Sequence, residues 1–345
     1  MDVRLSQEQQ ALRDSAAQIV DRLAPQAVGQ IGDPERRAKL DVAVAESGWR
    51  ELRTETEGGG SLATGVEPAI VAEELGRGLA DVSFLGPTLA TELRRLAGAE
   101  PGDTVETVAL DPGLSSLARA VNGESPAAVA IDAQGSARAL LLVPDGECHR
   151  VAQVELHAAP TGLDLTRPSV ILDPSAAAPV DAAARPITAD DITRWTALGL
   201  ALTCADLVGT MRGAVELATT YASERRQYGA PIGSFQAVQH MLADAFVVME
   251  GSRSVTLHAA WAVDALPAEE ALTAAAVAKA YCARAAINVC ETAIQVHGGI
   301  GNTWECRAHI YLRRSLLSSD ILGNASASLS HVLVHHGLEA ADGLR

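Results

Sequence analysis

Residues 222–244 read ASERRQYGAPIGSFQAVQHMLAD, which predicts a helix end, a Gly/Pro turn and the start of a second helix. A guanidinium group at such a turn can hold a pyrophosphate through two parallel hydrogen bonds, and carboxamides can bond a ribitol or an adenine edge. The residues of these types are Arg225, Arg226, Phe235, Gln236 and Gln239. An arginine in a last helical turn can also simply complement the helix dipole, and this is the favoured interpretation of Arg226.

A second stretch, AINVCETAIQVHGGIGNTWE at residues 286–305, ends a long predicted helix with Gln295 and His297 and continues into three glycines. Glycine has no Cβ, so a backbone can turn sharply there and a ligand can come close. A glycine C-cap explains one of the three but not all of them. GGIG does not fit GxGxxG and follows no predicted strand, which disfavours a Rossmann site.

Helical periodicity surrounds both stretches and runs from Thr188, a predicted cap, to about Leu338. Breaks at 229–234, 266–268 and 298–303 imply about four helices of roughly twenty or more residues, as in an antiparallel bundle. Upstream, periodicity of 3.6 residues predicts about four helices up to residue 100, the first capped by Ser6 and the second opened by Pro34.

The middle of the chain has short apolar runs that predict strands, namely TVETVAL, AAVAI, ALLLVP and PSVILD. We interpret the Pro/Ala-rich residues 173–186 as a linker. The predicted fold is α+β and multidomain. It has an N-terminal helical domain (1–100), a reduced β-domain with a linker (101–186) and a C-terminal four-helix bundle (187–345).

Composition excludes several classes of protein. The 345 residues are 48% hydrophobic and carry a formal charge of −16, which argues against nucleic-acid binding. Five cysteines without a CxxC pair support neither a disulfide framework nor a metal site, so we expect a reducing, cytoplasmic setting. The polar start, MDVRLSQEQQALRD, predicts no signal peptide, and no uncharged apolar run is long enough for a membrane span.

Together the two quoted stretches resemble the flavin-binding segments of the acyl-CoA dehydrogenase family, ERxxFG…FQ…Q…LAD and QxxGGxG. They stand here as ERRQYG at 224–229, FQAVQHMLAD at 235–244 and QVHGGIG at 295–301. GWRELRTETEGGG and EELGRGLA near the start, and LDLTRPSVIL in the middle, extend the resemblance over most of the chain. It implies FAD as the cofactor, held across two protomers by Arg225, Gln227, Phe235, Gln236, Gln239, Gln295, Gly298 and Gly299.

The resemblance fails where the family carries its chemistry. The family removes the α-proton of an acyl-CoA with a glutamate, and its two usual places fall on Leu322 and near Gly199, neither of which can take a proton. We find no TEPxAGSD or WITN segment, which in the family covers the isoalloxazine ring. No catalytic residue is therefore predicted. Asp320, Asp206 and Glu305 remain candidates for a displaced base.

A chain that keeps the adenosine side of the site but lacks the base resembles the shorter companion subunit of actinobacterial α2β2 acyl-CoA dehydrogenases of steroid side-chain β-oxidation. The resemblance implies a catalytic partner subunit, an acyl-CoA substrate and an electron-transferring flavoprotein as acceptor, with neither nucleic acid nor membrane as a partner. Two alternatives stay open. The chain could be a self-sufficient dehydrogenase with a displaced base, or a non-catalytic assembly protein on the same scaffold.

Overall fold

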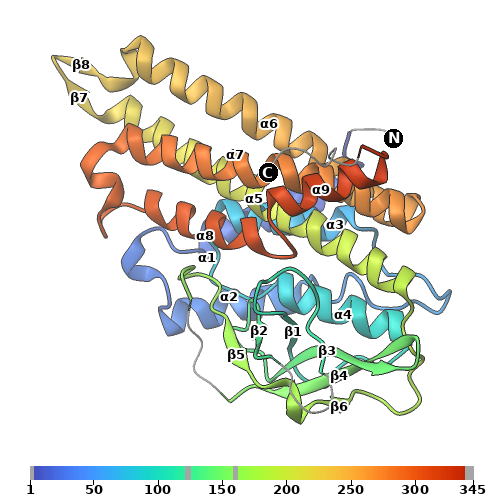
Figure 1. Cartoon of the computed structure of the whole chain (residues 1–345). Helices are drawn as coiled ribbons and strands as arrows, with labels where there is room; N and C mark the ends of the chain where they lie inside the picture. The colour runs from blue at the N-terminus through green and yellow to red at the C-terminus, as the bar shows by residue number, and fades with distance from the viewer. Residues whose placement is uncertain (1–3, 121–125, 158–161, 339–345) are drawn as a thin grey trace.

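The computed structural model describes residues 4–120, 126–157 and 162–338, in the predicted order of helices, strands and helices (Figure 1). The outer limits of the first and last predicted domains, residues 1 and 345, lie outside these ranges. The long helices α5, α6 and α7 lie on one side, and the sheet with the helix α4 lies on the other.

The N-terminal region forms four helices, as predicted. Ser6 caps the first through a capping box with Gln9, and Pro34 occupies the first turn of the second behind its cap, Asp33. Gly98 ends the fourth helix in the left-handed conformation that favours glycine. The helices are α1 (Gln7–Leu23), α2 (Pro34–Glu46), α3 (Val66–Arg77) and α4 (Leu85–Ala97), with a 3₁₀ turn η1 (Val28–Gln30) after the first.

The middle region is a six-stranded sheet of order β5-β2-β1-β3-β4-β6, in which only β1 and β3 are paired in parallel. Alternate residues face opposite sides: Val108 and Leu140 join the core shared with the helices, and Ala109 and Leu141 form a separate cluster. The strands are β1 (Glu106–Leu110), β2 (Ala128–Ala130), β3 (Arg138–Asp145), β4 (Cys148–Glu155), β5 (Val170–Leu172) and β6 (Ala178–Pro179).

Two features of the sheet correct the sequence prediction. Strand β4 was not predicted, because His149, Arg150 and Gln153 interrupt its apolar residues. The predicted linker at 173–186 is partly structured: it forms a 3₁₀ turn η2 (Pro174–Ala176) and then β6, whose two residues pair with β4. The free edge of β4 presents unpaired backbone N–H and C=O groups. A Pro/Ala-rich segment can pair with this edge, because proline lacks an N–H but keeps its carbonyl.

The C-terminal region begins with α5 (Ala189–Glu224), capped by Thr188 and Asp191. A hairpin of β7 (Arg226–Gln227) and β8 (Ala230–Pro231) and a 3₁₀ turn η3 (Ile232–Ser234) lead to the next two long helices. These are α6 (Gln236–Ala265) and α7 (Ala268–His297). By length and composition α5 is a candidate membrane span, but nearly all of that stretch is buried in the protein, as in the core helix of a bundle.

The prediction of a fourth long helix in the bundle was wrong in one respect, because this segment forms two shorter helices. After a 3₁₀ turn η4 (Gly298–Asn302) come α8 (Ala308–Asp320), of 13 residues, and α9 (Ala325–His335), of 11. Between them Leu322 and Gly323 have φ angles of 60° and 95°, which no helix accommodates, and Asn324 caps α9. The broken helix places a sharp turn beside α5.

Candidate flavin site

The first predicted motif lies around the β7–β8 hairpin, at one end of the bundle (Figure 1). Arg225 is the C-cap of α5: its amide donates to the Tyr221 carbonyl at 2.8 Å, and its carbonyl accepts from the Ile232 amide at 2.8 Å. Its guanidinium group is exposed and makes no ion pair within the described ranges. The backbone is thus fixed while the charged group stays available to a ligand.

The neighbouring candidates are exposed as well. Gln239 donates to the Gly233 carbonyl at 3.0 Å, and Gln227 donates to the Arg226 carbonyl at 2.9 Å. Phe235, 39% exposed, lies edge-on to Tyr228, 96% exposed, with ring centroids 6.3 Å apart. Tyr228 was not singled out from the sequence. Its place before Gly229 in a Gly/Pro turn was the available signal, and its backbone does bend there, with φ of 51°.

The second motif comes to the same end of the bundle, since His297, the last residue of α7, stacks on Tyr221 of α5 with ring centroids 4.4 Å apart. The Nδ1 of His297 bonds the Ala293 carbonyl at 2.7 Å. Burial alone lowers the pKa of His297, but its bonds to the Cys306 thiol and to that carbonyl raise it above its ordinary value. The stack fixes where the following glycines begin.

Gly298 and Gly299 face open space: a Cβ built on either meets no atom within 4 Å. Gly298 has φ of 64°, a conformation that glycine adopts freely. Gln295 is exposed on the last turn of α7. Bare backbone, a guanidinium group and carboxamides are the groups that a diphosphate and an adenosine need, so the residues present fit that part of FAD.

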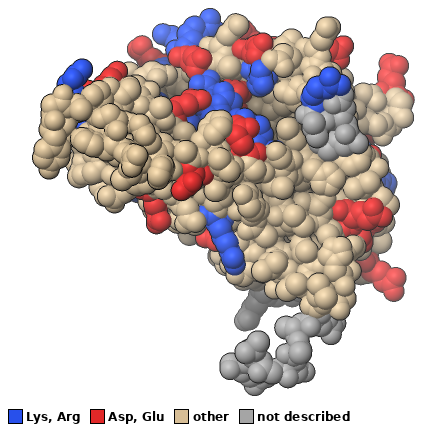
Figure 2. All heavy atoms as spheres, turned by 90° about the horizontal axis from the view of Figure 1, so that it is seen from above, with Lys and Arg blue, Asp and Glu red and all other residues tan. Residues whose placement is uncertain are grey.

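The lobe that carries this site is open and has few charged side chains. Seen from above, the left part of the molecule shows few charged side chains (Figure 2). Phe246 and Val247 of α6 are 51% and 67% exposed. Neither motif is enclosed by the chain itself, because the predicted cofactor residues are all exposed in the isolated protein. A binding site of ordinary depth therefore needs a second surface here.

The two positions expected for a base lie against each other in the buried interior. A Cβ built on Gly199 of α5 would be 2.2 Å from the Cδ1 of Leu322, so the leucine fills the space that the glycine leaves. Leu322 is 5% exposed. A proton acceptor is absent at both positions, and the volume between them is occupied by a hydrocarbon side chain.

The turn that carries Leu322 is covered by the segment DPGLSS at 111–116, directly after β1, which sequence reasoning did not single out. The Leu114 carbonyl accepts from the amides of Leu322 at 2.6 Å and Gly323 at 3.3 Å. Asp111 accepts from the hydroxyls of Ser115 and Ser116, both at 2.7 Å. The Asp-Pro-Gly turn signal was present in the sequence, but its contact with residues two hundred positions later was not.

Lys279 of α7 also stabilises this turn. Its side chain is fully buried and donates hydrogen bonds to the carbonyls of Ser318 and Ile321 at 2.5 and 2.8 Å. Burial lowers the pKa of Lys279 to about 8. These bonds satisfy carbonyls at the C-terminal end of α8 and fix the backbone just before Leu322.

The alternative bases are placed differently. Asp206 is 3% exposed, and although burial by itself raises its pKa, Arg167 and Arg314 hold that pKa below its ordinary value. Arg314 bonds it through two nitrogens at 2.9 and 2.7 Å. Asp320 and Glu305 are exposed. Asp206 has the geometry of an ion-pair network that joins α5 and α8 to the middle region.

Comparison with known proteins identifies the family. Residues 196–330 match the C-terminal domain of acyl-CoA dehydrogenases. Over 336 residues the chain is 30% identical to the acyl-CoA dehydrogenase IpdE2 of Mycolicibacterium smegmatis, covering 92% of this chain and 96% of that protein. The chain belongs to the acyl-CoA dehydrogenase family. IpdE2 of Mycobacterium tuberculosis is 32% identical over 337 residues, covering 92% of this chain and 93% of that one.

Solved acyl-CoA dehydrogenase structures share the fold. One is a Tcur3481-Tcur3483 steroid ACAD variant, with a TM-score of 0.78 and 24% identity over 96% of this chain and 99% of that one. Another is the ChsE4-ChsE5 complex from Mycobacterium tuberculosis, with a TM-score of 0.73 and 21% identity over 99% of this chain and 100% of that one. The predicted α+β fold is therefore confirmed, and family membership confirms FAD as the class of cofactor.

Proposed function

We propose that this acyl-CoA dehydrogenase family chain is a companion subunit, which contributes the adenosine and diphosphate side of an FAD site and takes its catalytic glutamate from a partner subunit. Bound FAD would supply the hydride acceptor for oxidation of the acyl-CoA. Arg225 would bind the diphosphate, Gln236 and Gln239 would bond the adenosine, and Gln295 with the bare backbone of Gly298 and Gly299 would approach the same groups from the adjoining protomer.

The observation that carries the proposal is the packing of Leu322 on Gly199. A base that removes an α-proton needs an acid-base group within hydrogen-bond reach of the substrate carbon. Here the two expected positions are a leucine and a glycine packed so closely that a Cβ on the glycine would collide with the leucine, and the DPGLSS segment covers the turn from outside. The site on the ring side is packed as core, which is a stable arrangement for a subunit that performs no proton transfer of its own.

The assembly is supported by the open lobe with its exposed hydrophobic side chains and by the heteromeric proteins that share the fold. The hydrophobic side chains of Phe235, Phe246 and Val247 are exposed to solvent in the isolated chain. Exposed apolar surface of this kind often marks a binding interface. The solved relatives are described as a ChsE4-ChsE5 complex and a steroid ACAD. We propose a partner of the same fold in an α2β2 assembly, a steroid side-chain CoA thioester as the substrate class, and an electron-transferring flavoprotein as the electron acceptor.

The test is co-expression with acyl-CoA dehydrogenase chains that carry the base, followed by the ratio of FAD to chain in the purified complex. We expect one FAD per two chains, with acyl-CoA oxidation by the complex and none by this chain alone. Stoichiometric FAD in the isolated chain, together with turnover, would show that it is self-sufficient.

Replacement of Arg225 by Ala, with Arg226→Ala as the matched control, separates flavin binding from assembly. If the complex forms with either variant but loses FAD only with the first, the half-site is on this chain. A complex that retains FAD with Arg225→Ala places the diphosphate contacts elsewhere and contradicts the proposal.

A further inference from the structure

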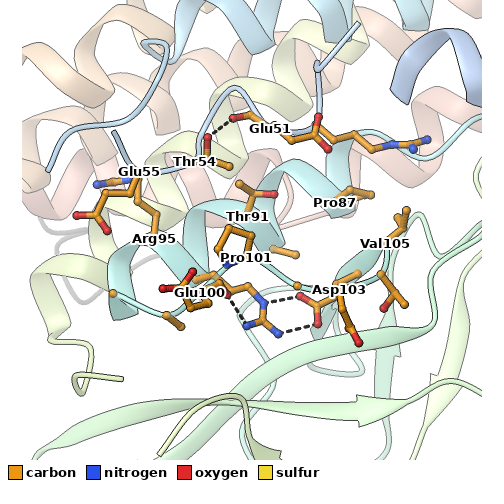
Figure 3. Close-up of a pocket in the computed structure, with 18 of the residues that line it drawn as sticks. Glu51, Thr54, Glu55, Pro87, Thr91, Arg95, Glu100, Pro101, Asp103 and Val105 are labelled. Carbon is orange, nitrogen blue, oxygen red and sulfur yellow. Dashed lines mark hydrogen bonds and ion pairs between the residues drawn. The ribbon is translucent and has the colours of Figure 1, made fainter. Parts of the chain in front are cut away.

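A cysteine and a histidine that the proposed function does not use are paired at the start of α8. Cys306 is 8% exposed and directly precedes Arg307, the N-cap of that helix. His297 ends α7, is 6% exposed and bonds the Cys306 thiol. The hollow between the 50–59 loop, α4 and the 98–106 segment (Figure 3) has neither a cysteine nor a histidine among its lining residues. Nucleophilic chemistry is therefore expected at the start of α8 rather than in that hollow.

Three groups around the Cys306 sulfur favour its thiolate form. The His297 imidazole bonds the sulfur, and the Ala308 amide donates to it from the first turn of α8. The Arg307 guanidinium adds positive charge nearby, so the main charged groups acting on the sulfur are both cations. A helix N-terminus and a neighbouring imidazole are two of the settings that lower the pKa of cysteine. Burial by itself raises the pKa of Cys306, but these three groups bring it below its ordinary value.

The imidazole of His297 has the orientation of a general base. Its Nδ1 bonds the Ala293 carbonyl at 2.7 Å, which leaves Nε2 for the Cys306 sulfur. Its ring stacks on that of Tyr221, with centroids 4.4 Å apart, so the imidazole is held from two sides. A nucleophile, a base and a third group that orients the base form the arrangement that activates a thiol.

The turn around Cys306 contains a polar atom without a partner. The Cys306 amide donates to the Thr303 carbonyl at 3.1 Å, and the ring of His309 bonds the backbone of the same residue. The Nε2 of His309 is buried and has no hydrogen-bond partner among the residues that the structure describes. A buried polar atom of this kind is costly unless a small polar molecule bonds it. Trp304 and Glu305 on the same turn are exposed, so such a molecule has a short way in from solvent.

From this geometry we propose that Cys306 is a modification site, which a small peroxide oxidises to a sulfenic acid. With hydrogen peroxide, the thiolate sulfur attacks one oxygen, so that an S–O bond forms as the O–O bond breaks. The hydroxide that leaves takes the proton of the His297 imidazolium and departs as water. The sulfur loses two electrons and the peroxide gains them. The reaction does not depend on the proposed flavin half-site, because neither residue is one of its proposed contacts.

The experiment treats the full chain with hydrogen peroxide in the presence of dimedone, which traps sulfenic acids, and measures the label on each cysteine by mass spectrometry. Cys148 is the internal control, because it is more exposed than Cys306 but lies in strand β4 and not at a helix N-terminus. We expect Cys306 to be labelled about 10-fold faster than Cys148 at neutral pH. Cys204, Cys282 and Cys290 are fully buried and should stay unlabelled.

His297→Phe tests the role of the base. It keeps a ring against Tyr221 but removes the nitrogen that bonds the sulfur. The matched control is His258→Phe, since His258 is exposed and also stacks on an aromatic ring, that of Trp261, with centroids 5.7 Å apart. We expect His297→Phe to slow the labelling of Cys306 about 10-fold and to move the midpoint of its pH profile upward, and His258→Phe to change neither.

The pH profile separates this chemistry from a change in access. Altered access changes the labelling rate at every pH but leaves the midpoint where it is, whereas loss of the imidazole moves the midpoint itself. A midpoint that His297→Phe leaves unchanged would overturn the proposal. So would labelling of Cys306 in the parent protein no faster than that of Cys148, a comparison that needs no substituted protein to fold.

Discussion

Replacing Gly199 by Ala tests whether Leu322 fills the position of the missing base. The new Cβ would lie 2.2 Å from the Leu322 Cδ1 and 3.5 Å from the nearest Leu89 methyl, and no real Cβ makes contacts of the first kind. Leu322 must then move inside a region where it is 5% exposed. Overpacking of a core costs about 1–3 kcal/mol, against about 1 kcal/mol gained when Ala replaces Gly inside a helix. We expect Gly199→Ala to lower the free energy of unfolding by up to about 2 kcal/mol.

The same substitution should have the opposite sign once Leu322 is shortened. Leu322→Ala alone should cost about 2–5 kcal/mol, because it leaves a cavity. In that background the new methyl group at position 199 meets the Leu89 methyls at 3.5 and 3.6 Å, an ordinary van der Waals contact, so Gly199→Ala should stabilise by up to about 1 kcal/mol. The coupling energy between the two sites is then about 1–3 kcal/mol. Urea unfolding of the four proteins, followed by circular dichroism, measures it. Effects that add within about 0.5 kcal/mol would refute the packing argument.

Three further predictions concern charged groups. Arg225→Ala should weaken FAD binding by the complex about 10- to 100-fold, because a hydrogen bond to a charged group contributes about 1.5–3 kcal/mol. Arg226→Ala should change FAD binding little. Flavin fluorescence titration measures both affinities, and a larger loss with Arg226→Ala would contradict the assignment. Asp206→Asn leaves the buried Arg314 without its carboxylate partner and Arg167 with Asp164 alone, and it should cost about 3–5 kcal/mol of unfolding free energy, against less than about 0.5 kcal/mol for the exposed Asp320→Asn. Burial lowers the pKa of Lys279 to about 8, so between pH about 8 and about 10.4 the unfolded chain binds more protons than the folded chain. The unfolding free energy of the parent relative to Lys279→Met should therefore rise with pH over that window. A difference that falls with pH would contradict this prediction.

Much of the fold could be predicted because local chemistry determines where most helices begin. Ser6, Asp33 and Thr188 accept hydrogen bonds from the first amides of their helices, and each is a residue type that does so in most proteins. The break between α8 and α9 was missed for the converse reason. Leu322 adopts a positive φ that its own type disfavours. Tertiary contacts stabilise it, among them the bond of its amide to Leu114 and the bond of Lys279 to the preceding Ile321.

The candidate site divides in the same way. The residues proposed for the adenosine side could be picked out from the sequence because a guanidinium, carboxamides and a Gly-Gly turn are unusual together. The structure shows that they are exposed, and their contact with the cofactor stays a prediction. The contact of DPGLSS with the turn at Leu322 could not be predicted, because it joins residues about two hundred positions apart through backbone hydrogen bonds. Backbone hydrogen bonds leave no signature in side-chain composition, so this part of the site is visible only in three dimensions.

The two sides of the proposed FAD site differ in a way that bears on the stability of the free chain. On the adenosine side, Arg225, Gln236 and Gly298 are solvated and need no partner in order to fold, so retaining them costs the free chain little. On the ring side, a buried carboxylate in place of Leu322 would have to be desolvated against Gly199 with no guanidinium group bonded to it, which costs several kcal/mol. A leucine there contributes packing energy instead. Loss of the base therefore stabilises this chain without affecting its exposed cofactor contacts, which is the combination that a companion subunit requires.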